Sequence, residues 1–211
     1  MQENDNKIYL VGYSGHSYVI LESVDRLGLK VYGYLDRSRQ TKNPYNLTFC
    51  GSEDEGHFIG WSEKSAFILA VGNNEIRRRI GLFIRSKSRK CLTIVDPGAT
   101  ISKSSTISSG TFVSAGAIIN AQVEIGEDVI INTSVVVEHE CKVGAGSHIA
   151  PGATILGNVE IGQNVFVGAN TVIKEGIKIK DNVIVGAGSV VIDDLESNLK
   201  IVGNPAKRIL R

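Results

Sequence analysis

The sequence has little that would direct the protein to a membrane or to nucleic acid. Its 23 Lys and Arg residues nearly balance its 22 Asp and Glu residues, so the formal net charge is only +1. Such a chain lacks the basic field that binds nucleic acid or anionic membranes, and the one cluster, Arg77–Arg79, is typical of a solvated helix face. No apolar run approaches the roughly 18 residues that span a bilayer. We therefore expect neither nucleic acid nor membrane insertion.

Cysteine is scarce, and a secretory signal is absent from the start of the sequence. Cys50, Cys91 and Cys141 are an odd number without the spacing of a metal site. Such usage suits a reducing compartment. The opening segment MQENDNKIYLVG lacks the basic stretch and apolar core of a signal peptide. We therefore expect a cytoplasmic protein without a metal, and its 211 residues suffice for two small domains.

A six-residue repeat fills the second half of the chain. From Val95 to Val191 in steps of six, all 17 positions are Val or Ile, and the residue four positions after each but the last is small or β-branched. Glycine recurs one and three residues after the aliphatic position, where a corner bends the backbone. Three hexapeptides make one coil with three short parallel strands, and coils stack through strand hydrogen bonds. The spacing predicts a parallel β-helix of five to six coils.

Strand-like and helix-like segments alternate in the first third of the chain. Apolar, strand-like runs cover 7–12, 29–36 and 65–74. Helix-like stretches cover 17–26 and 75–87. This alternation predicts a small parallel α/β sheet of Rossmann type.

The first turn of this domain lacks the fingerprint of a dinucleotide site. The pattern G-x-G-x-x-G would need glycine at 12, 14 and 17, and the chain has serine at 14 and 17, so NAD is not expected. A helix N-terminus still offers N–H groups to a phosphate, and Ser14 and His16 add donors. Asp36 ends the second strand, where such folds bind a ribose or base. The simpler alternative is that Ser14 only caps a helix and Gly15 only shapes its turn.

Residues 135–143, VVVEHECKV, place an imidazole between two carboxylates in a strand-forming run. His139 lies two residues after the core position Val137, so its side chain faces outward. Glu140 beside it fixes the tautomer of the ring. Gly157 follows one full coil later, so it lies above His139 and leaves its N–H open. A base beside an N–H donor suits acyl transfer; the ordinary alternative is a solvated strand histidine.

Several segments resemble bacterial nucleotide-sugar acyltransferases of the hexapeptide-repeat family, the PglD/NeuD type. The run IGEDVIINTSVVVEHECKVGAGSHIAPGATILGNVEIGQNVFVGANTV and the tail IVGNPAKRIL are similar to its repeats and to the segment that follows them. KIYLVGYSGHSYVI, YLDRS and AVGNNEIRRRI are similar to its N-terminal segments. The resemblance implies a Rossmann-like nucleotide-sugar-binding domain at 1–88, a left-handed β-helix acetyltransferase domain at 89–197 and a C-terminal tail at 198–211.

The resemblance also implies roles for single residues. His139 is the general base of a direct attack, and Glu140 supports it. The residues implied to bind the nucleotide sugar are Ser14, Gly15, His16, Asp36, Arg37, Gly72 and Asn132. Those implied to bind acetyl-CoA, or to lie beside it, are His148, Gly157, Ala169 and Ala187. Arg37 departs from an acidic pair found in the best-known relative.

His139 and His148 lie half a coil apart, so within one prism they occupy different faces. They can share a site only if a neighbouring subunit supplies one of them. Trimers of this family have their active sites in the groove between prisms. We therefore expect a homotrimer with inter-subunit active sites.

The function implied by the resemblance is acetyl-CoA-dependent N-acetylation of the 4-amino group of a UDP- or dTDP-linked 4-amino-4,6-dideoxy sugar. An alternative is O-acetylation of a sialic acid, because those enzymes share both domains and the His-Glu pair. A zinc carbonic anhydrase of similar fold would need three histidine ligands, and the repeats hold only two. A scaffold or sugar-sensing module would need neither a base nor a coenzyme groove.

Overall fold

The computed structural model describes residues 7–54, 58–61 and 64–209, and its N-terminal part is a parallel α/β sheet. The strand order is β3-β2-β1-β4-β5, and every pairing in the sheet is parallel. The strands are β1 (Lys7–Val11), β2 (Val31–Leu35), β3 (Thr48–Phe49), β4 (Ser65–Leu69) and β5 (Lys90–Cys91). The helices are α1 (Gly15–Arg26), α2 (Asn74–Ser86) and the 3₁₀ turn η1 (Ile59–Trp61). The predicted Rossmann-type alternation is confirmed; the two short edge strands β3 and β5 were not predicted.

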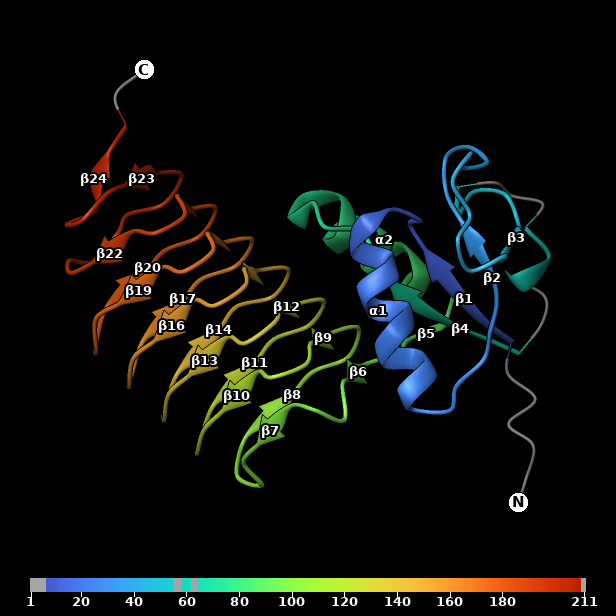
Figure 1. Cartoon of the computed structure of the whole chain (residues 1–211). Coiled ribbons are helices and arrows are strands. Elements are labelled where there is room, and N and C mark those ends of the chain that lie inside the picture. The colour runs from blue at the N-terminus through green and yellow to red at the C-terminus, as the bar shows by residue number, and fades with distance from the viewer. Residues whose placement is uncertain (1–6, 55–57, 62–63, 210–211) are drawn as a thin grey trace.

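The rest of the chain is a triangular β-helix whose short strands form three sheets (Figure 1). We call them the docked face, on which the N-terminal domain lies, and the apolar and charged faces, after their outward-facing side chains. The docked face consists of β6 (Ile94–Val95), β9 (Phe112–Val113), β12 (Ile130–Ile131), β15 (His148–Ile149), β18 (Phe166–Val167), β21 (Ile184–Val185) and β23 (Lys200–Val202), with β24 (Lys207–Arg208) folded back antiparallel. The apolar face consists of β7 (Thr100–Ile101), β10 (Ile118–Ile119), β13 (Val136–Val137), β16 (Thr154–Ile155), β19 (Val172–Ile173) and β22 (Val190–Val191). The charged face consists of β8 (Thr106–Ile107), β11 (Glu124–Ile125), β14 (Lys142–Val143), β17 (Glu160–Ile161) and β20 (Lys178–Ile179).

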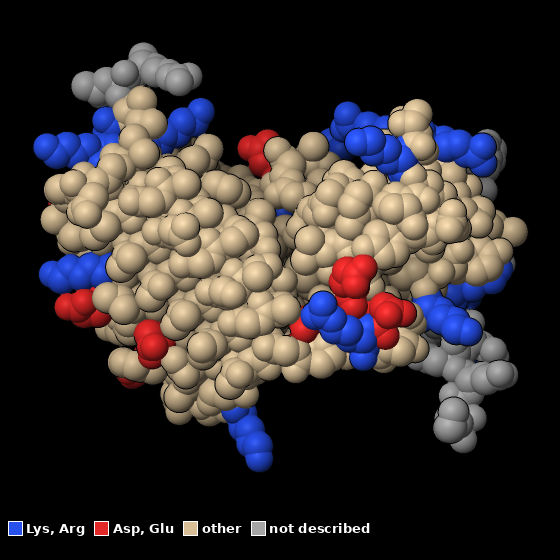
Figure 2. Space-filling view, viewed as in Figure 1, with Lys and Arg blue, Asp and Glu red and all other residues tan. Residues whose placement is uncertain are grey.

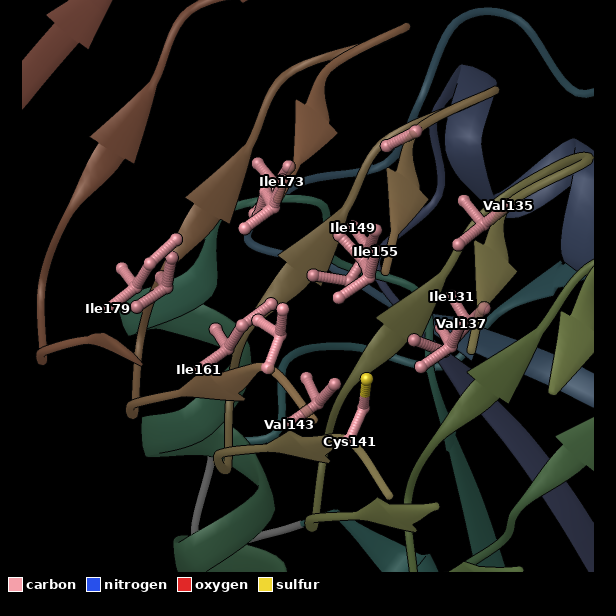
Figure 3. Packing of buried hydrophobic residues seen from close by; sticks show 14 of the residues in the cluster. Ile131, Val135, Val137, Cys141, Val143, Ile149, Ile155, Ile161, Ile173 and Ile179 are labelled. Carbon is pink, nitrogen blue, oxygen red and sulfur yellow. The ribbon is translucent and has the colours of Figure 1, made fainter. Parts of the chain in front are cut away.

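The aliphatic ladder fills the interior of this prism. Each strand pairs with the strand three hexapeptides further along the chain, as Ile119 pairs with Val137. Residues of successive coils point toward one another inside the prism, among them Ile131, Ile149 and Cys141 (Figure 3). The predicted coil of three hexapeptides is therefore confirmed, and Cys141 lies in the core as its repeat position predicts.

From residue 110 to residue 188, each corner of the prism contains one residue in the left-handed backbone region. The φ angle is positive at every sixth residue from 110 to 188, which allows a sharp turn between two strands. Ten of these 14 positions hold Gly or Asn, the residues that adopt this conformation most readily. The four exceptions are Gln122, Asp128, Ser134 and Glu140.

The boundaries between the parts differ slightly from the prediction. β5 pairs with β4 through Ala66 and Lys90, so the N-terminal sheet extends beyond residue 88. At the other end Lys200 pairs with Ile184, so the segment after residue 197 continues the docked face rather than forming a separate tail. No helix in the described ranges is long and apolar enough to cross a membrane.

Candidate active site

The N-terminal domain lies on the docked face, and none of its described elements covers the apolar or the charged face (Figure 1). Side chains of β1, β4 and α1 form one buried cluster with outward-facing side chains of the docked face. Those side chains are Ile94, Phe112 and Ile130. At the corner between the charged and docked faces, the fully buried Asp128 pairs with Arg78 and Arg85 of α2. The two domains therefore meet along one face and one corner of the prism.

His139 lies at the corner opposite the docked face, between the apolar and charged faces. Its Nδ1 is 3.0 Å from Glu140 Oε2, and both side chains are well exposed. A carboxylate only accepts, so Nδ1 carries the proton and Nε2 keeps its lone pair. The ring packs on Gly157 of the next coil, where an added Cβ would lie 2.7 Å from Nε2. Glycine at 157 is thus required for the imidazole to take this position.

Glu140 occupies one of the left-handed corner positions, with φ 60°. A residue with a Cβ pays about 1 kcal/mol or more for this conformation, which Gly or Asn adopts more readily. Strain of this kind is often kept where a side chain has a function. The function available to Glu140 is to accept the Nδ1 proton of His139.

Replacing Glu140 with Asn should stabilise the fold and slow the reaction. We expect the midpoint of thermal unfolding to rise, because about 1 kcal/mol of backbone strain is relieved. We expect kcat to fall at least about tenfold, because the ring loses the group that orients it. The matched control is Gln122→Asn, at the same corner one coil earlier, where φ is 63°. It should give similar stabilisation and unchanged kcat; equal kcat in both variants would contradict the role of Glu140.

Four residues expected to bind the nucleotide sugar line one pocket at the carboxyl ends of β1, β2 and β4. Ser14, Asp36, Arg37 and Gly72 surround a volume of about 270 Å³. Asp36 also shapes the pocket, because its carboxylate accepts hydrogen bonds from the backbone N–H groups of Tyr13 (3.1 Å) and Arg37 (2.7 Å). This edge is where doubly wound α/β sheets bind their ligands.

Two glycines near this pocket, Gly15 and Gly72, are not explained by packing within the chain. A Cβ added to Gly15 or to Gly72 would meet nothing within 4 Å. Neither residue has a positive φ. The absence of a side chain therefore leaves open space beside the backbone, as close approach of a ligand needs.

Three of the expected site residues meet at the interface between the N-terminal domain and the β-helix. They are His16 of α1 and Asn132 and His148 of the β-helix. The centroids of the two imidazoles lie 6.1 Å apart. Asn132 Nδ2 is 3.1 Å from His148 Nε2, while Asn132 Oδ1 accepts from the Thr133 N–H, so the amide donates to the imidazole. Burial, reinforced by the nearby Arg77 guanidinium, lowers the pKa of His148 to about 3 and that of His16 to about 4. Both rings are therefore neutral at neutral pH.

The expected acetyl-CoA residues do not form a single cluster in one chain. Gly157 lies with His139 between the apolar and charged faces. Ala169 and Ala187 lie in turns between the docked and apolar faces, and His148 is buried on the docked face. The separation of His139 and His148 onto different parts of the prism agrees with their half-coil spacing. In the described ranges no group of three metal-ligating side chains occurs.

Arg77 is a buried residue that the sequence analysis misplaced. It was expected on a solvated helix face, but only 1% of it is exposed. It lies between α2 and the β-helix and donates to the carbonyl oxygens of Val71 and Gly72, both at 3.0 Å. The helix period could have revealed it, because Arg77 is on the same side of α2 as Ile80 and Ile84.

Comparison with known proteins identifies both parts of the chain. The PglD N-terminal domain model matches residues 7–81, and the model of bacterial transferase hexapeptide (six repeats) matches 122–157 and 158–193. A histidine-to-asparagine mutant of perosamine N-acetyltransferase from Caulobacter crescentus, in complex with CoA and GDP-perosamine, is 30% identical with a TM-score of 0.93, over 98% of each chain.

A second similar structure is the acetyltransferase domain of PglB from Neisseria gonorrhoeae in complex with acetyl coenzyme A. It is 30% identical, with a TM-score of 0.89, over 98% of this chain and 100% of that chain. WeeI from Acinetobacter baumannii shares the fold at 21% identity, with a TM-score of 0.86. Because relatives of 30% identity cover nearly the whole sequence, the chain belongs to the PglD-type nucleotide-sugar acyltransferases of the hexapeptide-repeat family.

Proposed function

We propose that the chain transfers the acetyl group of acetyl-CoA to the 4-amino group of a 4-amino-4,6-dideoxy sugar carried on UDP or dTDP. The observation that carries this proposal is the His139 turn. An imidazole, oriented by Glu140 through Nδ1, presents Nε2 next to the backbone of Gly157. The similar structures that hold CoA or acetyl-CoA, one of them with a GDP-linked sugar, support the same class of reaction.

The proposed reaction needs no covalent enzyme intermediate. The sugar amine attacks the thioester carbonyl carbon, and His139 Nε2 accepts the proton that the nitrogen loses. The Gly157 N–H donates to the oxyanion of the tetrahedral intermediate. When the intermediate collapses, the C–S bond breaks and the imidazolium returns its proton to the leaving thiolate of coenzyme A. A base contributes about 10²–10⁴ in rate and one oxyanion donor about 3 kcal/mol.

The pocket at Ser14, Asp36, Arg37 and Gly72 is proposed to hold the nucleotide. Its position above the N-terminus of α1 gives a phosphate free N–H groups, and Arg37 adds a positive charge. His16 and His148 are then placed for the sugar and the coenzyme, and Asn132 orients His148. Because one similar structure holds a GDP-linked sugar, the test must include all three nucleotides.

A homotrimer is proposed because no described element of one chain covers the apolar face. Its outward residues are Thr100, Ile118, Val136, Thr154, Val172 and Val190, none of them charged. Figure 2, which has the view of Figure 1, shows hardly any charged side chains over β10 and β13. The charged face instead carries solvent-exposed ion pairs, such as Glu124 with Lys142. Uncovered β-branched strands suit burial against a second copy.

Threefold assembly would also complete the site. Suppose that three prisms lie side by side with their apolar faces toward a common axis. The corner of one subunit that carries His139 then lies beside the next subunit's corner with Asn132, Ala169 and Ala187. Within one chain His139 is at the corner opposite the docked face, on which the N-terminal domain lies. The proposed active site is therefore shared between neighbours.

An acceptor panel tests the proposed activity. Coenzyme A release from acetyl-CoA would be followed with UDP-, dTDP- and GDP-linked 4-amino-4,6-dideoxy sugars and with free sialic acid. Turnover on an amino sugar, with the acetyl group found on nitrogen by mass spectrometry, is the expected result. Turnover on sialic acid alone would replace the proposal by O-acetylation. Coenzyme binding without turnover on any acceptor would indicate a non-catalytic module.

A further inference from the structure

Arg77 is a buried cation that hydrogen-bonds to no carboxylate among the residues that the structure describes. Its guanidinium makes six hydrogen bonds, five to backbone carbonyls and one to the side-chain oxygen of Asn74. The nearby carboxylate of Asp128 pairs with Arg78 and Arg85 instead. Burial lowers the pKa of Arg77 to about 10, so the side chain remains charged at neutral pH. Burying a charge without a partner ion is costly, which calls for a reason.

The guanidinium connects the loop after β4 to two successive coils. Nη1 donates to the carbonyl oxygens of Val71 and Gly72, both at 3.0 Å. Nη2 donates to Gly146 O at 2.7 Å and to Ser147 O at 3.2 Å, directly before His148 on β15. Nε donates to Asp128 O at 2.8 Å, one coil earlier. The planar fork of arginine suits carbonyls arranged on two sides of it.

Asn74 extends the same connection to a third coil. Its Oδ1 accepts from Arg77 Nη2 at 3.0 Å, and its Nδ2 donates to Val165 O at 3.1 Å. The segment GNNEIR, residues 72–77, comprises the end of the loop and the start of α2. Its side chains hydrogen-bond to three successive coils. Its hydrogen bonds are made with backbone atoms of the β-helix, so they depend on coil geometry and not on side-chain identity there.

Attachment of α2 alone would not need Arg77. Arg78 and Arg85 already join the helix to Asp128. What Arg77 adds is contact with the Val71–Gly72 carbonyls. Gly72 lines both the 270 Å³ pocket and a second cleft of about 450 Å³ against β18 and β21. The Val71–Gly72 loop thus borders two spaces large enough for a ligand, and its carbonyl oxygens contact the Arg77 guanidinium.

We propose that Arg77 is a positioning residue, which fixes the Val71–Gly72 loop at a set distance from the coil of His148. This inference rests on the proposed function, in which the loop borders the nucleotide and His148 lies beside the sugar and coenzyme. The residue touches neither substrate. It sets the separation between the nucleotide pocket and the groove where the acetyl group is transferred, and a displacement of about 1 Å in such a geometry can cost about 10²-fold in rate.

The test compares Arg77→Lys with Arg85→Lys. Lysine keeps the charge at 77 but loses the fork, so it cannot hold carbonyls on both sides. We expect kcat/KM for the nucleotide sugar to fall by about 10²-fold, with the KM for acetyl-CoA changed less than about twofold. Arg85→Lys weakens the attachment of the same helix to the same corner but leaves the loop untouched. We expect Arg85→Lys to lower the unfolding midpoint by about as much as Arg77→Lys does. Its kcat/KM should stay within about threefold of the wild-type value.

A second measurement is independent of turnover. Amide hydrogen exchange of residues 71–74 should be faster in Arg77→Lys than in wild type and unchanged in Arg85→Lys. If Arg77→Lys does not fold, Asn74→Ala provides a milder comparison, since it removes the hydrogen bonds of the Asn74 side chain to Arg77 Nη2 and to Val165 O. Unchanged exchange in the loop, or an equal loss of kcat/KM in both arginine variants, would overturn the inference. Faster exchange in a protein that turns over no acceptor would instead overturn the proposed function alone.

Discussion

Replacing His139 with alanine is expected to lower kcat for amino-sugar acetylation by about 10²–10⁴. The imidazole is the group placed to take the proton from the attacking amine, because Nδ1 is held by Glu140 and Nε2 is free. Its side chain is 59% exposed and lies outside the hydrophobic core, so its removal should leave the fold intact. The measurement is steady-state kinetics on the accepted nucleotide sugar, together with calorimetric binding of acetyl-CoA and of the nucleotide sugar.

In His139→Ala we expect kcat to fall while the binding of both substrates is retained. We expect both dissociation constants to stay within about threefold of wild type, since the lost interaction is realised in the transition state. A matched control is Glu138→Gln, which changes a polar residue of the same turn. It should keep kcat within about threefold. Full activity of His139→Ala on any acceptor would show that another group removes the proton, even if the family and the fold stand.

The architecture was predictable because two periods in the sequence are unusually regular. Val or Ile at every sixth residue fixes which side chains face the interior, and the coil of three hexapeptides follows from the triangular cross-section. The strand–helix alternation in the first third was also sufficient to predict β1, α1, β2, β4 and α2. The short edge strands β3 and β5 escaped prediction, because such brief segments carry no period of their own.

The contacts between domains were less predictable, because they depend on side chains from distant parts of the chain. Arg77 donates to carbonyls of Asp128 and Gly146, and backbone acceptors leave no trace in a sequence. A partial signal did exist at the corners. Asp128 and Glu140 stand where Gly or Asn is common, and both proved to interact with a specific partner. An acidic residue at a left-handed corner is thus a marker of a specific interaction within this repeat.

Mixing two inactive variants should restore about a quarter of wild-type activity if neighbouring subunits share each site. His139→Ala lacks the base. Gly72→Phe places a ring in the open space beside the nucleotide loop, where a Cβ meets nothing within 4 Å, and should block binding without unfolding. In randomly assembled trimers, one site in four takes His139 from one variant and the nucleotide pocket from the other. The measurement is coenzyme A release after the subunits are dissociated and reassembled together.

A second mixture shows whether the recovered activity comes from sites shared between subunits or from residual activity of the single variants. Wild type reassembled with an equal amount of the double variant, His139→Ala with Gly72→Phe, should retain about a quarter of full activity if sites are shared and about half if each chain holds its own. The two inactive single variants, assembled separately and then mixed, should show none. Half activity in the mixture of wild type with the double variant, and none in the complementation, would place His139 and the nucleotide pocket in one chain. The β-helix would then have to bring a corner and its opposite face together, which its rigid, regularly paired coils do not allow.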